Sequence, residues 1–196
     1  MATINLVKGQ KINLQKGGGG SLTKFCAGAN WGAHPNGSPI DLDLHAAMFT
    51  DDKQLLEHIY FGNLASTNRA IFSSGDDRSG DVGGDDGLDN EIMTMDFTKL
   101  PANCSKVAVF LCSFGGDDFA IVPHAEVRIY EGTAEHVSNV VASYKIGKEP
   151  SFSGFVVMVM GIFYKHNGEW KFNAVGTPTK DSDYNQALVT IKNKFL

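Results

Sequence analysis

Polar and apolar residues alternate at every second position over much of the chain, and this pattern predicts half-buried β-strands. In residues 41–49 the apolar side chains fall on one face, while Asp41, Asp43 and His45 fall on the other. Strands are predicted on this basis at residues 4–7, 11–14, 24–31, 41–49, 91–97, 106–114, 126–130, 140–146, 155–165 and 170–175, with residues 55–61 and 70–73 flanking the turns between them.

Glycine-rich connections and one apolar run refine this pattern. Asn167-Gly168 is a strong signal for a tight hairpin between the last two strands. Gly17 to Gly20 predict a flexible turn near the N-terminus. Residues 106–114 are apolar almost throughout, which predicts a strand buried on both faces.

Only the C-terminus has helical spacing, and Asp181 or Ser182 can cap the helix that it predicts. The apolar positions of this helix are Tyr184, Ala187, Leu188, Ile191 and Phe195. Many short strands followed by one helix predict an antiparallel β-sandwich with a C-terminal helix packed on a sheet. No linker divides the sequence, so we expect a single domain over residues 1–196.

Charge and cysteine usage exclude several classes of protein. The formal net charge is −5 and the lysines are scattered singly, so no basic face for nucleic acid is predicted. The longest apolar run, residues 155–164, is about half of the roughly 20 residues that cross a bilayer, and the N-terminus has no apolar signal core. Cys26, Cys104 and Cys112 are far apart, which predicts free thiols in a reducing compartment. We therefore expect a cytoplasmic protein without a transmembrane segment.

The acidity of the chain is concentrated in one glycine-rich segment, residues 75–91, GDDRSGDVGGDDGLDNE. From Asp76 to Glu91 it carries six aspartates and one glutamate against the single base Arg78, a local charge of −6. Its carboxylates repel one another and it has almost no apolar residue to bury. The segment is therefore either a solvated loop or a loop that a cation holds together.

Asp41 and Asp43 are the second acidic feature, because residues i and i+2 of a strand project from the same face. Two carboxylates in this position are either solvent-facing acids or a rigid half-site for a cation. Oxygen-only donors suit Ca²⁺, which takes six to eight oxygens and tolerates irregular geometry, better than Mg²⁺. Zinc is disfavoured because the histidines and cysteines form no ligand pairs. His45, on the same face as the two aspartates, is the histidine closest to this chemistry.

Four segments of the sequence resemble the TerD family of tellurium-resistance and stress-response proteins. They are INLVKGQKINL near the N-terminus, DLDLHAAMF, the loop GDDRSGD with DNEIMTMDFTKLP after it, and GIFYKHNGEWKFNAVG. The resemblance extends over residues 4–176. It implies a β-sandwich that binds two Ca²⁺ ions and has no known catalytic activity.

The resemblance also implies a ligand set. The family's loop begins Asp-Asn-x-Thr-Gly, which is matched here by residues 76–80, and closes on Asp-Asp-Glu, matched here by residues 89–91 with Asn90 in the middle position. Extra residues at 82–88 leave two candidates for the family's second aspartate, either the pair Asp85-Asp86 or Asp89. The full set of expected metal ligands is Asp41, Asp43, Asp76, Asp77, Asp81, Asp85, Asp86, Asp89 and Glu91.

Three functions are compatible with these residues. The leading one is a non-catalytic calcium-binding module in tellurite and stress resistance, which acts through protein or membrane-associated partners. The second is a metal-dependent hydrolase of a phosphorylated substrate, in which His45 is the one candidate general base apart from the ligands. The third is calcium-dependent binding to anionic lipid, since a bound metal reverses the local charge.

Overall fold

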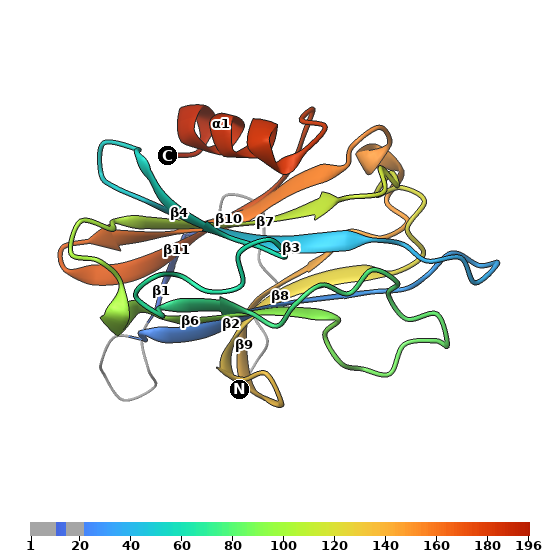
Figure 1. Ribbon diagram of the computed structural model, residues 1–196, viewed down its shortest axis with the longest axis horizontal. Helices are drawn as coiled ribbons and strands as arrows, with labels where there is room; N and C mark the ends of the chain where they lie inside the picture. Colours follow the sequence, from blue (N-terminus) through green and yellow to red (C-terminus); the bar gives the residue numbers. More distant parts are fainter. Residues whose placement is uncertain (1–10, 15–21) are drawn as a thin grey trace.

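The protein is a two-layer antiparallel β-sandwich with one α-helix on its outside (Figure 1). A computed structural model describes residues 11–14 and 22–196. Within these residues, one sheet has six strands in the order β1 (Lys11–Asn13), β11 (Glu169–Thr179), β10 (Val157–His166), β7 (Lys106–Ser113), β3 (Leu42–Phe49) and β4 (Leu55–Ile59). The other has five in the order β5 (Ile71–Ser73), β6 (Glu91–Asp96), β2 (Lys24–Trp31), β8 (Ala125–Thr133) and β9 (His136–Lys145). The predicted fold class is confirmed.

Most strand positions agree with the alternation in the sequence. The strand predicted at residues 24–31 is confirmed as β2, and Asn167 and Gly168 form the β10–β11 hairpin turn with φ angles of 52° and 83°. Strands β8 and β9 extend further toward each other than predicted, because the polar residues near their hairpin still pair across it. The strand predicted at residues 4–7 and the turn at residues 17–20 lie outside the described residues.

The main core lies between the two sheets. Leu44 and Met48 point into it from β3, and Phe25 and Trp31 point into it from β2. All four are almost fully buried, as expected for the apolar face of alternating strands. The apolar run of β7 is buried on both faces from Val107 to Ser113, as predicted, whereas Phe114 lies beyond the end of the strand and is 62% exposed.

Helix α1 (Tyr184–Lys194) covers the outer face of the six-stranded sheet (Figure 1). Its Ala187 and Ile191 belong to a second apolar cluster with Ala47 of β3 and Phe110 of β7. Because both faces of β3 are covered, its polar residues are buried together with its apolar ones. The alternation in the sequence did not show that the outer face of β3 is also buried.

The helix cap was predicted wrongly. Asp183, rather than Asp181 or Ser182, caps α1, and its Oδ1 accepts hydrogen bonds from the backbone N–H of Asn185 at 2.7 Å and of Gln186 at 3.0 Å. Asp181 instead accepts hydrogen bonds from the hydroxyls of Thr179 and Thr190, at 2.6 and 2.8 Å. That pair of contacts ties the end of β11 to the helix.

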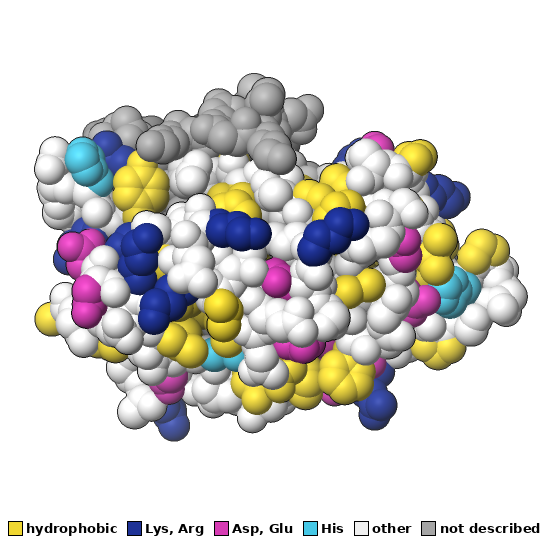
Figure 2. Space-filling view, turned by 90° about the horizontal axis from the view of Figure 1, so that it is seen from above, with side chains coloured by type: hydrophobic (Ala, Val, Ile, Leu, Met, Phe, Trp, Pro, Cys, Tyr) yellow, Lys and Arg dark blue, Asp and Glu magenta, His cyan; other side chains and the backbone are white. Residues whose placement is uncertain are grey.

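In the part of the chain that the structure describes, no helix has both the length and the apolar character that crossing a bilayer requires. On the face seen in Figure 2, Lys and Arg side chains are scattered among uncharged atoms rather than gathered in one area. The two short 3₁₀ turns at Phe97–Lys99 and Pro150–Phe152 complete the described elements.

Candidate metal centre

The rigid part of the candidate site lies at the start of β3. Asp41 precedes the strand and Asp43 lies within it, so both carboxylates project from the same face. Pairing with β7 on one side fixes this end of the strand, since the backbone N–H of Phe114 donates to the carbonyl of Asp41 at 3.0 Å. Asp43 is 2% exposed, and its carboxylate has no hydrogen bond or ion pair within the described residues. Oδ1 of Asp41 is inaccessible to solvent and has no hydrogen-bond partner there.

The acidic segment 75–91 is an ordered loop that crosses the end of the sandwich. The backbone N–H of Asp81 donates to the carbonyl of Trp31 at 2.9 Å, which fixes the middle of the loop to the end of β2. Gly80 has φ +63° and passes so close to Trp31 that a Cβ at this position would lie 2.6 Å from the indole ring. Glycine is therefore required here both by its backbone conformation and by its close approach to the ring.

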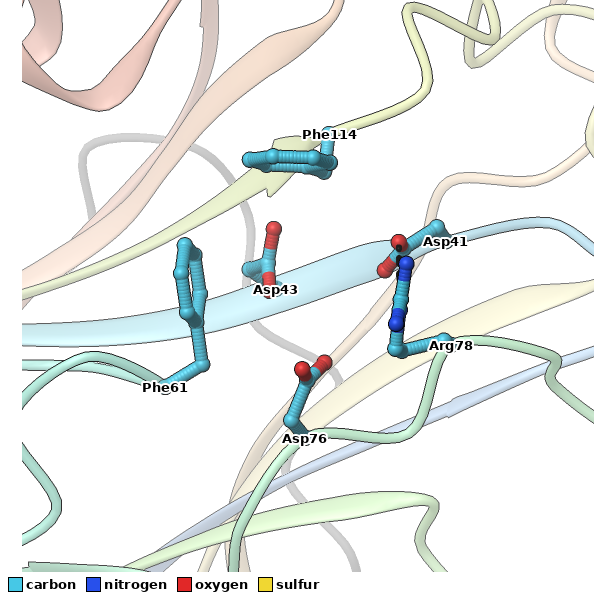
Figure 3. Close-up of a pocket in the computed structure, with 6 residues that line it drawn as sticks. All are labelled: Asp41, Asp43, Phe61, Asp76, Arg78 and Phe114. Atoms are coloured by element: carbon cyan, nitrogen blue, oxygen red, sulfur yellow. Dashed lines mark ion pairs between the residues drawn. The ribbon is translucent and has the colours of Figure 1, made fainter.

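This path brings Asp76 to the two aspartates of β3. One carboxylate oxygen from each of Asp41, Asp43 and Asp76 lies within 4.8 Å of the others. The three carboxylates line a pocket of about 140 Å³, whose other walls are Phe61, Arg78 and Phe114 (Figure 3). The expected meeting of the β3 strand and the acidic loop is present at this point.

Asp81, Asp85 and Asp86 form a second group in which one oxygen from each residue lies within 4.8 Å of the others. Two asparagines hold this group in place. Asn30 donates to Asp81 at 3.5 Å and to Asp85 at 3.3 Å, and Asn90 donates to Asp81 at 2.9 Å. The extra residues of the loop therefore bring their two aspartates to Asp81.

Asp89 lies elsewhere. Its buried carboxylate accepts a hydrogen bond from Nε of Arg128 at 2.9 Å and packs over Gly28, where there is no room for a Cβ. It belongs to neither acidic group. Of the two candidates for the family's second aspartate, the structure places Asp85 and Asp86 in an acidic group and pairs Asp89 with a cation of the chain itself.

Glu91 and Asp77 connect the loop to β3. Glu91 is buried; its Oε2 accepts from the backbone N–H of Leu44 at 2.7 Å, and its Oε1 accepts from that of Asp77 at 3.2 Å. Oδ1 of Asp77 accepts from the backbone N–H groups of Ser79 and Gly80, at 2.9 and 3.0 Å, in a local turn. Both residues were predicted as ligands, and in this structure their oxygens hold the backbone that positions Asp76.

The electrostatics of the site favour a cation. Burial, followed by repulsion from Asp41 and Asp76, raises the pKa of Asp43 to about 7. Burial also raises the pKa of Glu91 to about 8, although the hydrogen bond from the backbone N–H of Leu44 acts to lower it. Carboxyl groups with such raised pKa values lack a compensating positive charge. A divalent cation between Asp41, Asp43 and Asp76 would supply such a charge.

His45 is directed away from the pocket, although it lies on the same face of β3 as Asp43. It is fully buried, its Nδ1 lies 3.0 Å from Nε2 of His58, and its ring stacks on Phe110 with centroids 4.7 Å apart. Burial and the neighbouring His58 lower the pKa of His45 well below its ordinary value. The single candidate general base therefore does not line the pocket.

Asp117 and Asp118, in the loop after β7, have partners outside the pocket. Oδ1 of Asp117 lies 3.1 Å from Nε2 of His34. Asp118 accepts hydrogen bonds from the backbone of Ala120 and Gly154, which is a turn-stabilising role. The residues that sequence reasoning missed are the walls Phe61 and Phe114 and the positioning residue Asn30, because strand pairing rather than local sequence brings them to the site.

The family model of the TerD domain matches residues 1–194. The chain belongs to the TerD family. It is 32% identical to the stress response protein SCP2 of Bacillus subtilis, over 91% of this chain and 94% of that protein. It is 29% identical to the tellurium resistance protein TerZ of Serratia marcescens, over 88% and 89% of the two chains.

A solved structure from the same family has the same fold. The TerD homologue of Streptomyces coelicolor A3(2) superposes with a TM-score of 0.69, covering 89% of this chain and 98% of the other at 17% sequence identity. At this identity the likeness concerns the fold alone. The family model over residues 1–194 confirms the TerD resemblance that the loop and strand motifs indicated.

Proposed function

We propose that this TerD-family protein binds Ca²⁺ between β3 and the acidic loop, and acts as a non-catalytic binding module in resistance to tellurite and related stress. The observation that carries the calcium proposal is the carboxylate of Asp43, which is buried, unpartnered and directed into a pocket with Asp41 and Asp76. A buried ionised carboxylate is strongly unfavourable unless a cation or hydrogen bonds compensate it. Oxygen-only donors at this spacing suit a hard cation.

The proposal includes two ions. The first is held by Asp41, Asp43 and Asp76, and the second by Asp81, Asp85 and Asp86. The residues of the second group are more exposed than those of the first, so the second ion binds more weakly than the first. Asp77 and Glu91 support the first site by holding the loop against β3.

Ca²⁺ is preferred over Mg²⁺ because part of the cage comes from a glycine-rich loop. Mg²⁺ requires near-ideal octahedral geometry and retains much of its water, whereas Ca²⁺ accepts irregular carboxylate cages. The role in stress resistance follows from the relatives, among them a tellurium resistance protein and a stress response protein. The three free, buried cysteines fit a reducing compartment, so we place the protein in the cytoplasm.

Thermal unfolding with and without metal tests the calcium proposal. A ligand that binds only the native state adds about 2.7 kcal/mol of stability at a hundredfold excess over its dissociation constant. We expect the melting temperature to rise clearly with Ca²⁺ and much less with Mg²⁺. The rise should be lost in the double variant Asp41→Asn/Asp43→Asn and kept in the control Asp51→Asn, which removes a carboxylate whose side chain is 97% exposed and far from the pocket. An unchanged melting temperature at millimolar Ca²⁺ would refute the proposal.

A further inference from the structure

The pocket over Asp41, Asp43 and Asp76 has an open side that the chain does not fill with oxygen ligands. Its remaining walls are the rings of Phe61 and Phe114 and the side chain of Arg78 (Figure 3). Neither a phenyl ring nor a guanidinium can coordinate a metal. Held through one oxygen from each of the three carboxylates, a cation has three protein ligands, while Ca²⁺ takes six to eight. A cation in this pocket therefore keeps coordination positions on its open side for oxygens from outside the chain.

Arg78 gives this open side an affinity for anions. Its Nε lies 3.9 Å from Oδ2 of Asp41, and its side chain is 74% exposed, so the contact with Asp41 is loose. The three carboxylates and Arg78 together carry a charge of −2, which one Ca²⁺ neutralises. A cation bound to Asp41 would compete with Arg78 for that carboxylate. A guanidinium then offers parallel N–H donors that match the oxygens of a phosphate group.

Phe61 and Phe114 add an apolar wall beside the anion position. Their ring centroids lie 5.6 Å apart at an interplanar angle of 85°, so the two rings form a corner. Phe114 is 62% exposed, although it is a large apolar residue next to a polar pocket.

We infer that this pocket binds a phosphate ester that carries a small apolar or aromatic group. The phosphate oxygens fill the open positions of the cation and contact Arg78, while the organic group packs into the corner of Phe61 and Phe114. The inference rests on the proposed calcium site, and it concerns binding alone. The ester is either a soluble compound or the headgroup region of a phospholipid, because both present the same phosphate next to an apolar group.

Phenyl phosphate is the probe for this inference, and inorganic phosphate is its ring-free counterpart. Both are titrated calorimetrically into the full chain saturated with Ca²⁺, at phosphate concentrations that do not precipitate calcium. Packing one ring face into the corner strengthens binding of phenyl phosphate about tenfold over inorganic phosphate. Neither probe should bind after chelation of the metal.

Two variants separate the contributions of the walls. Phe114→Ala should weaken phenyl phosphate about tenfold and leave inorganic phosphate unchanged, whereas Arg78→Gln should weaken both about tenfold. Because Arg78 and Phe114 both line the pocket, the Ca²⁺ affinity of each variant is measured first, and the two phosphate probes are then compared at metal saturation. Phe72→Ala is the matched control, since Phe72 is also a partly exposed phenylalanine (38%) but lies on β5, away from the pocket.

The source of the ester is decided by vesicles of phosphatidic acid and phosphatidylcholine. Calcium-dependent co-sedimentation that Phe114→Ala abolishes and phenyl phosphate competes away assigns the pocket to a lipid, whereas binding of phenyl phosphate without co-sedimentation assigns it to a soluble ester. Normal Ca²⁺ binding with no affinity for phenyl phosphate overturns the inference alone. Failure to bind Ca²⁺ overturns the proposed function and the inference with it. Equal loss of both probes in Phe114→Ala contradicts the assignment of the ring to the organic group.

Discussion

Replacing Asp43 by asparagine should stabilise the metal-free protein while abolishing its response to calcium. Asp43 is 2% exposed, has no partner within the described residues, and faces Asp41 and Asp76. Its carboxyl group has a pKa of about 7 in the folded chain against an ordinary value of 3.8. The asparagine side chain is almost isosteric and carries no charge, so it removes the desolvated charge without leaving a cavity.

The sign and size of the effect follow from these pKa values. Because the folded state binds the proton of Asp43 more tightly than the unfolded state, ionisation destabilises the fold. This penalty begins near pH 3.8, grows as the pH rises, and is complete above about pH 7. A difference of about 3 pKa units corresponds to about 4 kcal/mol. Between pH 5 and pH 8 the penalty grows by about 2.5 kcal/mol.

Chemical denaturation of the chelated proteins at pH 5 and pH 8 measures this effect. The free energy of unfolding of Asp43→Asn, relative to the wild type, should be higher at pH 8 than at pH 5 by about 2.5 kcal/mol. Saturating Ca²⁺ should reverse the order, since only the wild type gains from the metal. Asp51→Asn, with its exposed side chain, should follow the wild type at both pH values. A metal-free Asp43→Asn that is less stable than the wild type at pH 8, or one that keeps the full calcium response, would refute this account of the site.

Three further predictions follow from other contacts. Asp85→Asn/Asp86→Asn should reduce the calorimetric stoichiometry from two Ca²⁺ to one, because these residues form the second acidic group; an unchanged stoichiometry contradicts the two-site arrangement. Gly80→Ala should destabilise the protein by about 1–3 kcal/mol and weaken Ca²⁺ binding, because φ is +63° at this position and the new Cβ would meet Trp31. An unchanged melting curve would show that the loop does not depend on the close approach of Gly80 to Trp31. Burial lowers the pKa of His58 to about 4, so the stability that its neutral form contributes is present above about pH 6.5 and is lost as the pH falls toward 4. In His58→Phe the loss of stability between pH 6.5 and pH 4 should be about 3 kcal/mol smaller than in the wild type, as measured by denaturation at these two pH values. An unchanged pH dependence would contradict this prediction.

The strands of the sandwich were predictable because one face of each faces a common core. The inward residues of β2 and β3, such as Phe25 and Leu44, repeat every second position, and that period alone places them. The helix was predictable for the same reason at its own period. Its cap was not, since Asp181, Ser182 and Asp183 are all chemically able to cap, and the hydrogen bond that engages Asp181 with Thr190 depends on the folded arrangement.

The candidate site was predictable in its ligand types but not in its arrangement. The burial of Asp43 depends on elements distant in the sequence that cover the outer face of β3. Asp89 is withdrawn from the acidic groups because strand pairing places Arg128 beside it. Phe61 follows β4 and Phe114 follows β7, and they reach the pocket because both strands pair with β3. Such contacts depend on sheet order, which the local sequence does not contain.

Diffraction from crystals grown with Ca²⁺ tests the central claim most directly, because anomalous scattering locates the ion. The account predicts a strong peak within about 2.3–2.6 Å of carboxylate oxygens of Asp41, Asp43 and Asp76, and a weaker one among Asp81, Asp85 and Asp86. A first pocket that remains without a peak at saturating Ca²⁺, or an ion coordinated by Asp89 in place of Asp43, would contradict it.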